Sequence, residues 1–369
     1  MSTTAASPWL AAMTTRSVLF LSAWVGLVLV PVVAPPWQAF PDHPIVDGWS
    51  RFDTSWYQSI WEYGYSYDPG AQSNVAFFPL FPTLVGLVAQ PLERWMTPLQ
   101  AFCLAGTIVS HLAFALALAG LHRLTARRLG PDAATRTVWL LATSPFALFF
   151  SAVYTESLFL CLAVWAFERA DAGRWWSANV LAAGCAVTRV PGILIGAALG
   201  LEYLRMRRGR LDVRVLGFVL PLAALAALAA FFHSRFGDAL VFKTTQATWD
   251  RHAGVGHLVD GVRRVLHPGP YDVRLLTAMY LGSIPIVVAL GALAWRRLGP
   301  GYALFTLAAF ILPVSTSLEA LGRQELVLFP VFMVAGSLLG RRAFLVCAGL
   351  GLVAQLWLLY HFTHWHMVT

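Results

Sequence analysis

Hydrophobic positions form long runs that recur along the whole 369-residue chain, and most of the polar segments between them are short. Each of several runs is long enough to cross the roughly 30 Å hydrocarbon core of a bilayer as a helix. Short polar connections leave no room for a separate soluble domain. The pattern therefore predicts one all-α domain that crosses the membrane many times.

Composition supports this prediction, since 58% of the residues are apolar and only 12% are charged, against roughly 25% charged in soluble domains. The net charge of +8 comes from arginines in short clusters between apolar runs, which the positive-inside rule explains without a nucleic-acid partner. Four clusters mark the cytoplasmic loops: Arg123 with Arg127, Arg128 and Arg136; Arg205 with Arg207, Arg208 and Arg210; Arg296 with Arg297; and Arg341 with Arg342.

A topology of about eleven spans places all four clusters on one side, with the amino terminus inside and the carboxyl terminus outside. The predicted spans are residues 17–35, 99–122, 137–153, 155–170, 176–188, 191–204, 214–233, 276–296, 300–317, 326–340 and 343–362. Residues 36–98 and 234–275 are then the two large external loops, and most acidic residues also fall outside. This distribution indicates that the chemistry takes place on the external face of a cell membrane.

In this topology residues 76–92 do not cross the membrane completely, because a full crossing would place the first arginine cluster on the external side. The segment contains Pro79, Pro82 and Pro91, which disfavour a regular lipid-facing helix. We therefore expect a re-entrant or surface-lying segment. The spans on either side of "TRVPG" at 188–192 are also short, and short broken helices at membrane depth are tolerated where they line a protein cavity.

Acidic and aromatic residues gather immediately after the first span, in "RFDTSWYQSIWEYGYSYDPG" from Arg51 to Gly70. The rings of Trp56 and Tyr57 suit a substrate site, but an interfacial aromatic belt is an equally open interpretation. Asp53 is harder to explain in that way, because a carboxylate near hydrocarbon costs about 3 kcal/mol unless it is paired or hydrated. Asp53 is therefore the leading candidate for a functional residue.

Three segments resemble the GPI mannosyltransferase II family and its bacterial relatives: the first loop with "NVAFFPLFP", then "SPFALFFSAVYTESLF" at 144–159, then "FGDALVFKTTQATWDR" at 236–251. A later stretch, "GRQELVLFPVF", is similar to a family segment that usually has Tyr where this chain has Gln324. Phe52 likewise stands where the family usually has Trp. The resemblance implies the fold of a C-type glycosyltransferase that uses a polyprenyl-phosphate sugar, with mannose as the sugar and inversion at the anomeric carbon.

Such a transfer needs a base for the acceptor hydroxyl and cations for the departing phosphate. Asp53 is the candidate base. Arg189 and Arg323 are the strongest candidate cations because both lie beside apolar spans, although ion pairs with Glu156 or Glu319 would also explain them. Arg51 is a further candidate substrate ligand, and pairing with Asp53 or Asp47 is the alternative.

The turn "VYTES" presents Tyr154 and Glu156 on the external face. Glu156 is expected to orient an acceptor hydroxyl, with helix capping as the alternative. Asp238 and Gln246 in the second external loop are candidate sugar ligands, although Asp238 after Gly237 first suggests a turn. Trp249 and Asp250 have the same standing.

No metal or cofactor is expected, because the chain has neither a D-x-D motif nor a glycine-rich phosphate loop. The histidines of "HFTHWH" at 361–366 are spaced for an interfacial tail rather than for one face of a helix. The expected partners are the lipid-linked sugar donor, a hydroxyl-bearing acceptor (a lipid glycan, a protein or a wall polymer) and the bilayer. A lipid or glycolipid flippase without transferase activity is the alternative function.

Overall fold

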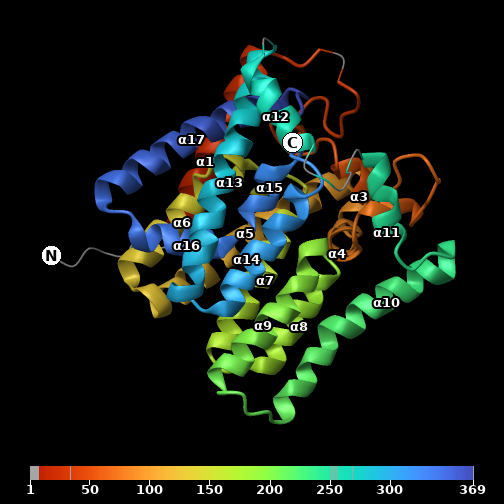
Figure 1. Ribbon diagram of the computed structural model, residues 1–369. Helices are drawn as coiled ribbons and strands as arrows, with labels where there is room; N and C mark the ends of the chain where they lie inside the picture. The colour runs from red at the N-terminus through yellow and green to blue at the C-terminus, as the bar shows by residue number, and fades with distance from the viewer. Residues whose placement is uncertain are drawn as a thin grey trace.

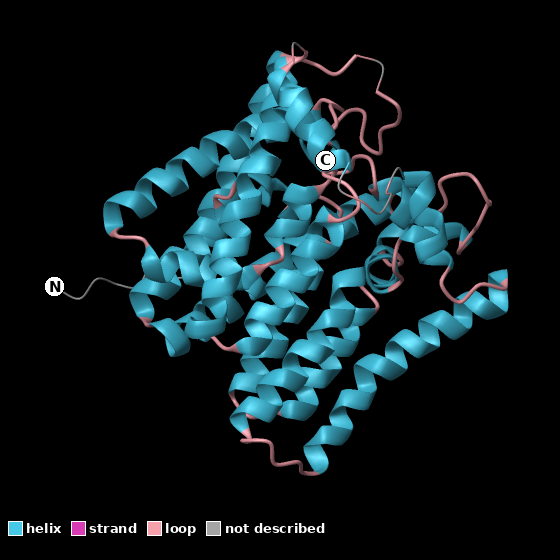
Figure 2. Ribbon diagram, in the orientation of Figure 1, coloured by secondary structure: helices cyan, strands magenta, loops and turns pink. Residues whose placement is uncertain are grey.

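The computed structural model describes residues 8–33, 35–249, 251, 254, 256–267 and 269–368. These residues form helices joined by loops, with no strand among them (Figure 2). The first half contains α1 (Pro8–Leu29), α2 (Pro44–Asp47), α3 (Thr54–Tyr63), α4 (Leu80–Ala89), α5 (Pro98–Leu129), α6 (Pro131–Ala142), α7 (Glu156–Asp171), α8 (Trp175–Ala186) and α9 (Ile193–Met206). The second half contains α10 (Val219–Phe236), α11 (Val241–Thr244), α12 (Gly256–Leu266), α13 (Tyr271–Arg297), α14 (Pro300–Val314), α15 (Leu321–Leu326), α16 (Phe329–Leu338) and α17 (Arg341–Thr363).

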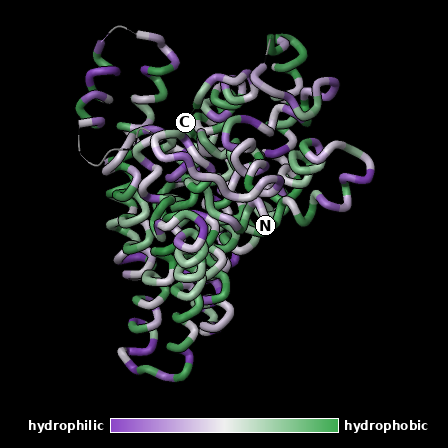
Figure 3. Tube along the Cα trace, turned by 90° about the vertical axis from the view of Figure 1, so that its right-hand side faces the viewer, coloured by the Kyte–Doolittle hydropathy of each residue, from purple (hydrophilic) through white to green (hydrophobic). Residues whose placement is uncertain are grey.

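The all-α membrane architecture predicted from the sequence is confirmed. In the described part of the chain, five helical segments are long and apolar enough to cross a membrane: α1, α5, α13, α17 and residues 213–236, which end in α10. Hydrophobic residues predominate along the helices, as Figure 3 shows. The total of eleven crossings stays a prediction.

The predicted span 137–153 is not one helix, because α6 ends at Ala142 and a short 3-10 segment, Pro145–Phe150, follows. The buried guanidinium of Arg16 explains how this break is tolerated. It donates to the carbonyl oxygens of Ala142 at 3.1 Å and Ala147 at 2.8 Å, and so satisfies acceptors that a continuous helix would have paired. Arg16 lies on α1, more than 120 residues away in sequence, so no local pattern announces the break.

Residues 76–92 contain α4, whose ten residues extend only about 15 Å at 1.5 Å per residue. That is half of the hydrocarbon thickness, so α4 alone does not cross. Its first amide, from Leu80, donates to the carbonyl oxygen of Val187 at 3.0 Å, at the end of α8. These features favour the re-entrant or surface-lying interpretation.

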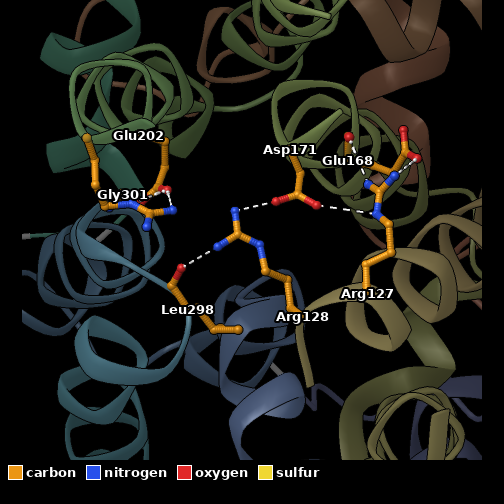
Figure 4. A network of polar contacts seen from close by, with 8 residues as sticks. Arg127, Arg128, Glu168, Asp171, Glu202, Leu298 and Gly301 are labelled. Carbon is orange, nitrogen blue, oxygen red and sulfur yellow. Dashed lines mark hydrogen bonds and ion pairs between the residues drawn. The ribbon is translucent and has the colours of Figure 1, made fainter. Parts of the chain in front are cut away.

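One end of the bundle is held together by a network of ion pairs (Figure 4). Glu168 is fully buried and accepts Arg127 Nη1 at 3.2 Å. Arg128 pairs with Asp171 and donates to the carbonyl oxygen of Leu298 at 3.0 Å, which joins α5 to α7 and to the α13–α14 turn. This end therefore carries acidic residues too, as the partners of its arginines.

The same network ties α9 to α14, since Glu202 accepts the amide of Gly301 at 2.8 Å. Gly299 lies two residues before Gly301 and has φ +130. A Cβ on Gly299 would lie 2.5 Å from Glu202 Oε1, so both the backbone and the space favour glycine at this position. Arg136 donates to the carbonyl oxygen of Leu339 at 2.7 Å. The four arginine clusters thus gather at the end that includes the α9–α10 connection, whereas α3, α12 and α15 lie in the opposite, upper half of Figure 1.

Single-cysteine labelling tests the predicted sidedness of these two ends. In a background without the native cysteines, a membrane-impermeant maleimide added to intact cells should label Gln72→Cys and should not label Leu211→Cys, because both side chains are exposed in the protein and the topology predicts that they lie on opposite sides of the membrane. Permeabilised cells should allow both to react. Labelling of Leu211→Cys alone from outside would contradict the topology.

Candidate active site

Arg323 joins two carboxylates that come from distant parts of the chain. Its Nη1 lies 2.8 Å from Asp53 Oδ2, and its Nε lies 2.9 Å from Glu156 Oε1. Glu156 is fully buried, and the Asp53 and Arg323 side chains are 19% and 10% exposed. The protein thus brings together the predicted base, the predicted orienting acid and one predicted cation in a single site.

Both carboxylates sit at helix amino termini without capping them. Asp53 precedes α3 and Glu156 begins α7, and neither helix has a side-chain cap hydrogen bond. The capping alternative for Glu156 is therefore not what the structure shows. The positive ends of the two helix dipoles favour ionised carboxylates at these places, which leaves the carboxylate oxygens to face the site.

Arg189 is the second cation of the site, in the loop between α8 and α9. Its Nη1 lies 2.8 Å from Glu156 Oε1, and its Nη2 donates to Gln324 Oε1 at 2.9 Å. Gln324, which stands where the family usually has Tyr, thus orients Arg189. Arg189 and Arg323 thus both form ion pairs with Glu156, which is one of the two partners named as alternatives; Glu319 is not their partner.

Aromatic rings enclose the Arg323 guanidinium, which lies 4.4 Å from the ring centroid of Tyr154 and 5.2 Å from that of Phe149. Burial alone would lower the pKa of Arg323, but the carboxylates of Glu156 and Asp53 raise it well above its ordinary value. The cation therefore stays charged at any physiological pH.

Tyr154 also fixes the backbone beside Asp53. Its hydroxyl accepts the Asp53 amide and donates to the Arg51 carbonyl oxygen, both at 3.3 Å. Phe52 between them has φ +45, and Ala320, three residues before Arg323, has φ +58. Strain of this kind persists only where surrounding contacts impose it and is typical of functional sites.

A group of aromatic side chains borders the site. Trp56 stacks on Phe77 with centroids 6.1 Å apart, and Trp249 packs edge-on against both rings at 5.5 Å. Tyr57 is almost fully buried and contacts Tyr154 edge-on at 6.3 Å. The two predicted external loops therefore meet through these rings, and Trp249 packs the second loop against α3.

That contact brings in a residue that the sequence analysis did not single out, Arg251. Its Nη1 donates to Gln246 Oε1 at 2.9 Å, so Gln246 orients a cation. Burial lowers the pKa of Arg251 and the nearby charge of Arg323 lowers it further, whereas Asp53 acts in the opposite direction. Arg251 is the last residue of the third family-like segment, 236–251, and this position was the sequence feature that could have identified it as a site residue. Asp250 lies outside the described residues.

Two other candidates have contacts of a structural kind. Arg51 is 1% exposed, and its Nη1 lies 2.7 Å from Asp47 Oδ2, so pairing with Asp47 is the alternative that the protein adopts. Asp238 accepts the amide of Leu240 at 2.8 Å and the hydroxyl of Thr244 at 2.7 Å, as expected for a turn. These contacts do not support roles in substrate binding.

Comparison with known sequences identifies what this arrangement is similar to. The sequence profile of the mannosyltransferase (PIG-V) family matches residues 42–205, the part that carries Asp53, Glu156 and Arg189. The resemblance to the GPI mannosyltransferase II family is confirmed. GPI alpha-1,6-mannosyltransferase 2 of Cricetulus griseus is 31% identical over 154 residues, and that of Homo sapiens is 30% identical. These matches cover 41% of this chain and only 30% of the length of each relative.

One solved structure has a fold similar to that of this chain. ArnT from Cupriavidus metallidurans bound to undecaprenyl phosphate aligns with 91% of this chain and 61% of its own, with a TM-score of 0.51 and 15% sequence identity. At that identity the similarity establishes the fold alone. The alignment with ArnT extends into the carboxyl-terminal part of the chain, which the mannosyltransferase (PIG-V) profile does not match.

Because Glu156 is fully buried and Asp53 is partly exposed, we predict that their removal lowers the stability of the protein to different extents. Glu156→Ala should lower the free energy of unfolding by roughly 3–5 kcal/mol, because it leaves two guanidinium groups without their buried partner. Asp53→Ala should cost only about 1 kcal/mol, since Asp53 is partly exposed and Arg323 keeps Glu156. Thermal unfolding of the purified proteins in one detergent measures both. Equal losses would contradict the central position of Glu156.

Proposed function

We propose that this protein is an inverting membrane mannosyltransferase that transfers mannose from a polyprenyl phosphate to an acceptor hydroxyl at the external membrane face. The observation that carries the proposal is the contact of Arg323 with both Asp53 and Glu156. In this contact the carboxylate of Asp53, which is 19% exposed and is the proposed base, is hydrogen-bonded to a guanidinium of the kind that binds phosphate. The family similarity supports mannose as the sugar.

Three arginines gather at the site, and arginine is well suited to an anionic donor. Arg189 and Arg323 pair with the carboxylates of Glu156 and Asp53, and Arg251 lies near enough for Arg323, Asp53 and Glu319 to act on its pKa. A phosphate that binds Arg323 competes directly with Asp53 for the same guanidinium. Donor binding then frees the Asp53 carboxylate to accept the acceptor proton. The attack of the oxygen displaces the lipid phosphate and inverts the anomeric carbon.

Glu156 is suited to holding the acceptor. Its Oε1 is occupied by the two arginines, whereas its Oε2 is buried without a hydrogen-bond partner among the described residues. A buried carboxylate oxygen without a partner is costly, and an acceptor hydroxyl would satisfy it. Glu156 thereby orients the nucleophile while Asp53 receives the proton.

The lipid part of the donor and the sidedness of the site have independent support. The fold neighbour ArnT was solved with undecaprenyl phosphate, which makes a polyprenyl phosphate a reasonable donor lipid here. The arginine clusters gather at the end of the helices opposite to α3, which follows Asp53 (Figure 1), and the positive-inside rule predicts that this end is cytoplasmic. We assign the enzyme accordingly to a cell membrane, with its site outside.

Removal of the base should abolish most turnover while donor binding survives. Asp53→Asn keeps the shape of the side chain but cannot accept the proton, so turnover of radiolabelled polyprenyl-phosphate mannose should fall by about 10²–10⁴. Glu156→Gln should cost less, because an amide oxygen can still orient a hydroxyl. Asp68→Asn, an exposed acid in the same loop, is the matched control and should stay at the normal rate.

An Asp53→Asn enzyme that folds, binds donor and transfers sugar at nearly the normal rate would refute the assigned base. A product in which the sugar keeps the anomeric configuration of the donor would refute the single-displacement mechanism. A flippase without transferase activity would instead move the lipid across the bilayer and yield no glycosylated product.

Replacement of the cations should weaken donor binding more than acceptor binding. Arg323→Ala and Arg189→Ala each remove a charge-assisted contact to phosphate, with an expected loss of about 1.5–3 kcal/mol in donor affinity. Lysine should restore only part of it, because it lacks the two-pronged guanidinium geometry. Arg235→Ala, an exposed residue at the end of α10, is the control. Unchanged donor affinity in both variants would make these arginines purely structural.

A further inference from the structure

Glu325 is an acidic residue beside the active site that takes no part in the proposed reaction. It lies on α15, two residues after Arg323, and α15 packs against α13, α14 and the 3-10 segment Pro145–Phe150 (Figure 1). Among the described residues Glu325 forms no ion pair, and its carboxyl group contacts the hydroxyl of Ser283 on α13. An ionised carboxylate without a cation would be costly in this apolar setting.

The contacts of Ser283 indicate which group supplies the proton of this hydrogen bond. The Ser283 Oγ also lies 2.7 Å from the carbonyl oxygen of Tyr280, about one turn earlier on α13. A hydroxyl has one proton to donate, and a carbonyl oxygen can only accept. Both hydrogen bonds form at once when Ser283 donates to Tyr280 and the protonated carboxyl group of Glu325 donates to Ser283.

The groups around Glu325 favour this neutral acid. Tyr280 is the titratable group that faces it from α13, and the 3-10 segment and the second half of α14 carry no titratable side chain. On its own helix, Arg323 is engaged with Asp53 and Glu156. Burial raises the pKa of Glu325 to about 8, and its hydrogen bond offsets only part of this rise. Most of the protein therefore carries a protonated Glu325 at neutral pH.

The Glu325 contact and the active-site ion pairs hold α15 from different sides. Arg323 is bonded to carboxylates at the starts of α3 and α7, whereas Glu325 is bonded to α13. Ala320, at the start of α15, has φ +58, a conformation that persists only where surrounding contacts impose it. A deprotonated Glu325 has no proton to donate to Ser283, so α15 would lose one of its two attachments.

We propose that Glu325 is a positioning residue that acts as a protonated acid: its hydrogen bond to Ser283 fixes α15 and so holds Arg323 in place. Loss of this proton releases α15 and makes the site sensitive to alkaline pH. The protonated state rests on the contacts of Glu325, whereas the effect on turnover rests on the proposed function.

Melting temperatures test the protonated state without relying on catalysis. Glu325→Gln keeps a neutral group that can donate to Ser283, and it is compared with the unmodified full chain in one detergent between about pH 5 and about pH 9. In the unfolded chain Glu325 ionises near its ordinary pKa of 4.5, whereas in the folded protein it keeps its proton up to about pH 8. The folded state thus binds more protons in this window, and its stability falls as the pH rises.

The Gln variant lacks this loss, so its advantage in melting temperature should grow up to about pH 8 and then stay constant. Glu93→Gln, which changes an exposed acid, is the matched control and should show no such growth. A difference between Glu325→Gln and the unmodified protein that is independent of pH would overturn the proposal.

Turnover tests the positioning role. The substrate is radiolabelled polyprenyl-phosphate mannose, in host membranes that supply the acceptor. The unmodified protein should slow roughly tenfold from about pH 7 to about pH 9, because the protonated fraction of Glu325 falls from about nine-tenths to about one-tenth. Glu325→Gln should stay within about twofold over this range, since its amide does not titrate. Glu325→Ala, which cannot donate, should be several-fold slower throughout.

The outcomes separate this inference from the proposed reaction. If Glu325→Gln loses turnover at alkaline pH as steeply as the unmodified protein, or if Glu325→Ala turns over normally, the positioning role is overturned. An absence of product from the unmodified protein at every pH would refute the proposed function and with it the effect on turnover. The melting temperatures would then still support or overturn the protonated state.

Discussion

The arrangement of the site depends on one buried guanidinium, that of Arg323. It contacts carboxylates 270 and 167 residues earlier in the chain, at the starts of α3 and α7. Burial of an ion is costly unless it is paired, so the carboxyl-terminal half must pack where these two helices begin. The family-like amino-terminal part and the carboxyl-terminal half consequently contact each other at the site.

Backbone strain occurs at the same place and for the same reason. Phe52 and Ala320, both with positive φ, flank the two sides of the Asp53–Arg323 contact. Hydrogen bonds from Tyr154 hold the first of these turns, and the ion pair crosses between them. Groups that are already in position before a substrate arrives need little reorganisation, so they can stabilise the charge that develops in a transition state.

Charge in an apolar setting was visible in the sequence, whereas the charge partners could be named only as alternatives. Asp53, Glu156, Arg189 and Arg323 stood out because ions beside hydrocarbon need a reason, and the protein does gather them. The apolar runs likewise revealed the membrane helices. The break after α6 remained hidden because its cap, Arg16, comes from a distant helix. A contact between residues so far apart in the sequence produces no local sequence pattern from which it could be predicted.

Arg251 shows the same limit within a motif that had been noticed. Arg251 is near the site because Trp249 packs against Trp56 and Phe77, a contact between the two predicted external loops. The charge of Arg323 lowers the pKa of Arg251, whereas the charges of Asp53 and Glu319 raise it, so the two loops and the segment that carries Arg323 are coupled electrostatically. Under the proposed function, a lipid phosphate that binds Arg323 would compete with Asp53 for the guanidinium and release the carboxylate by the same event.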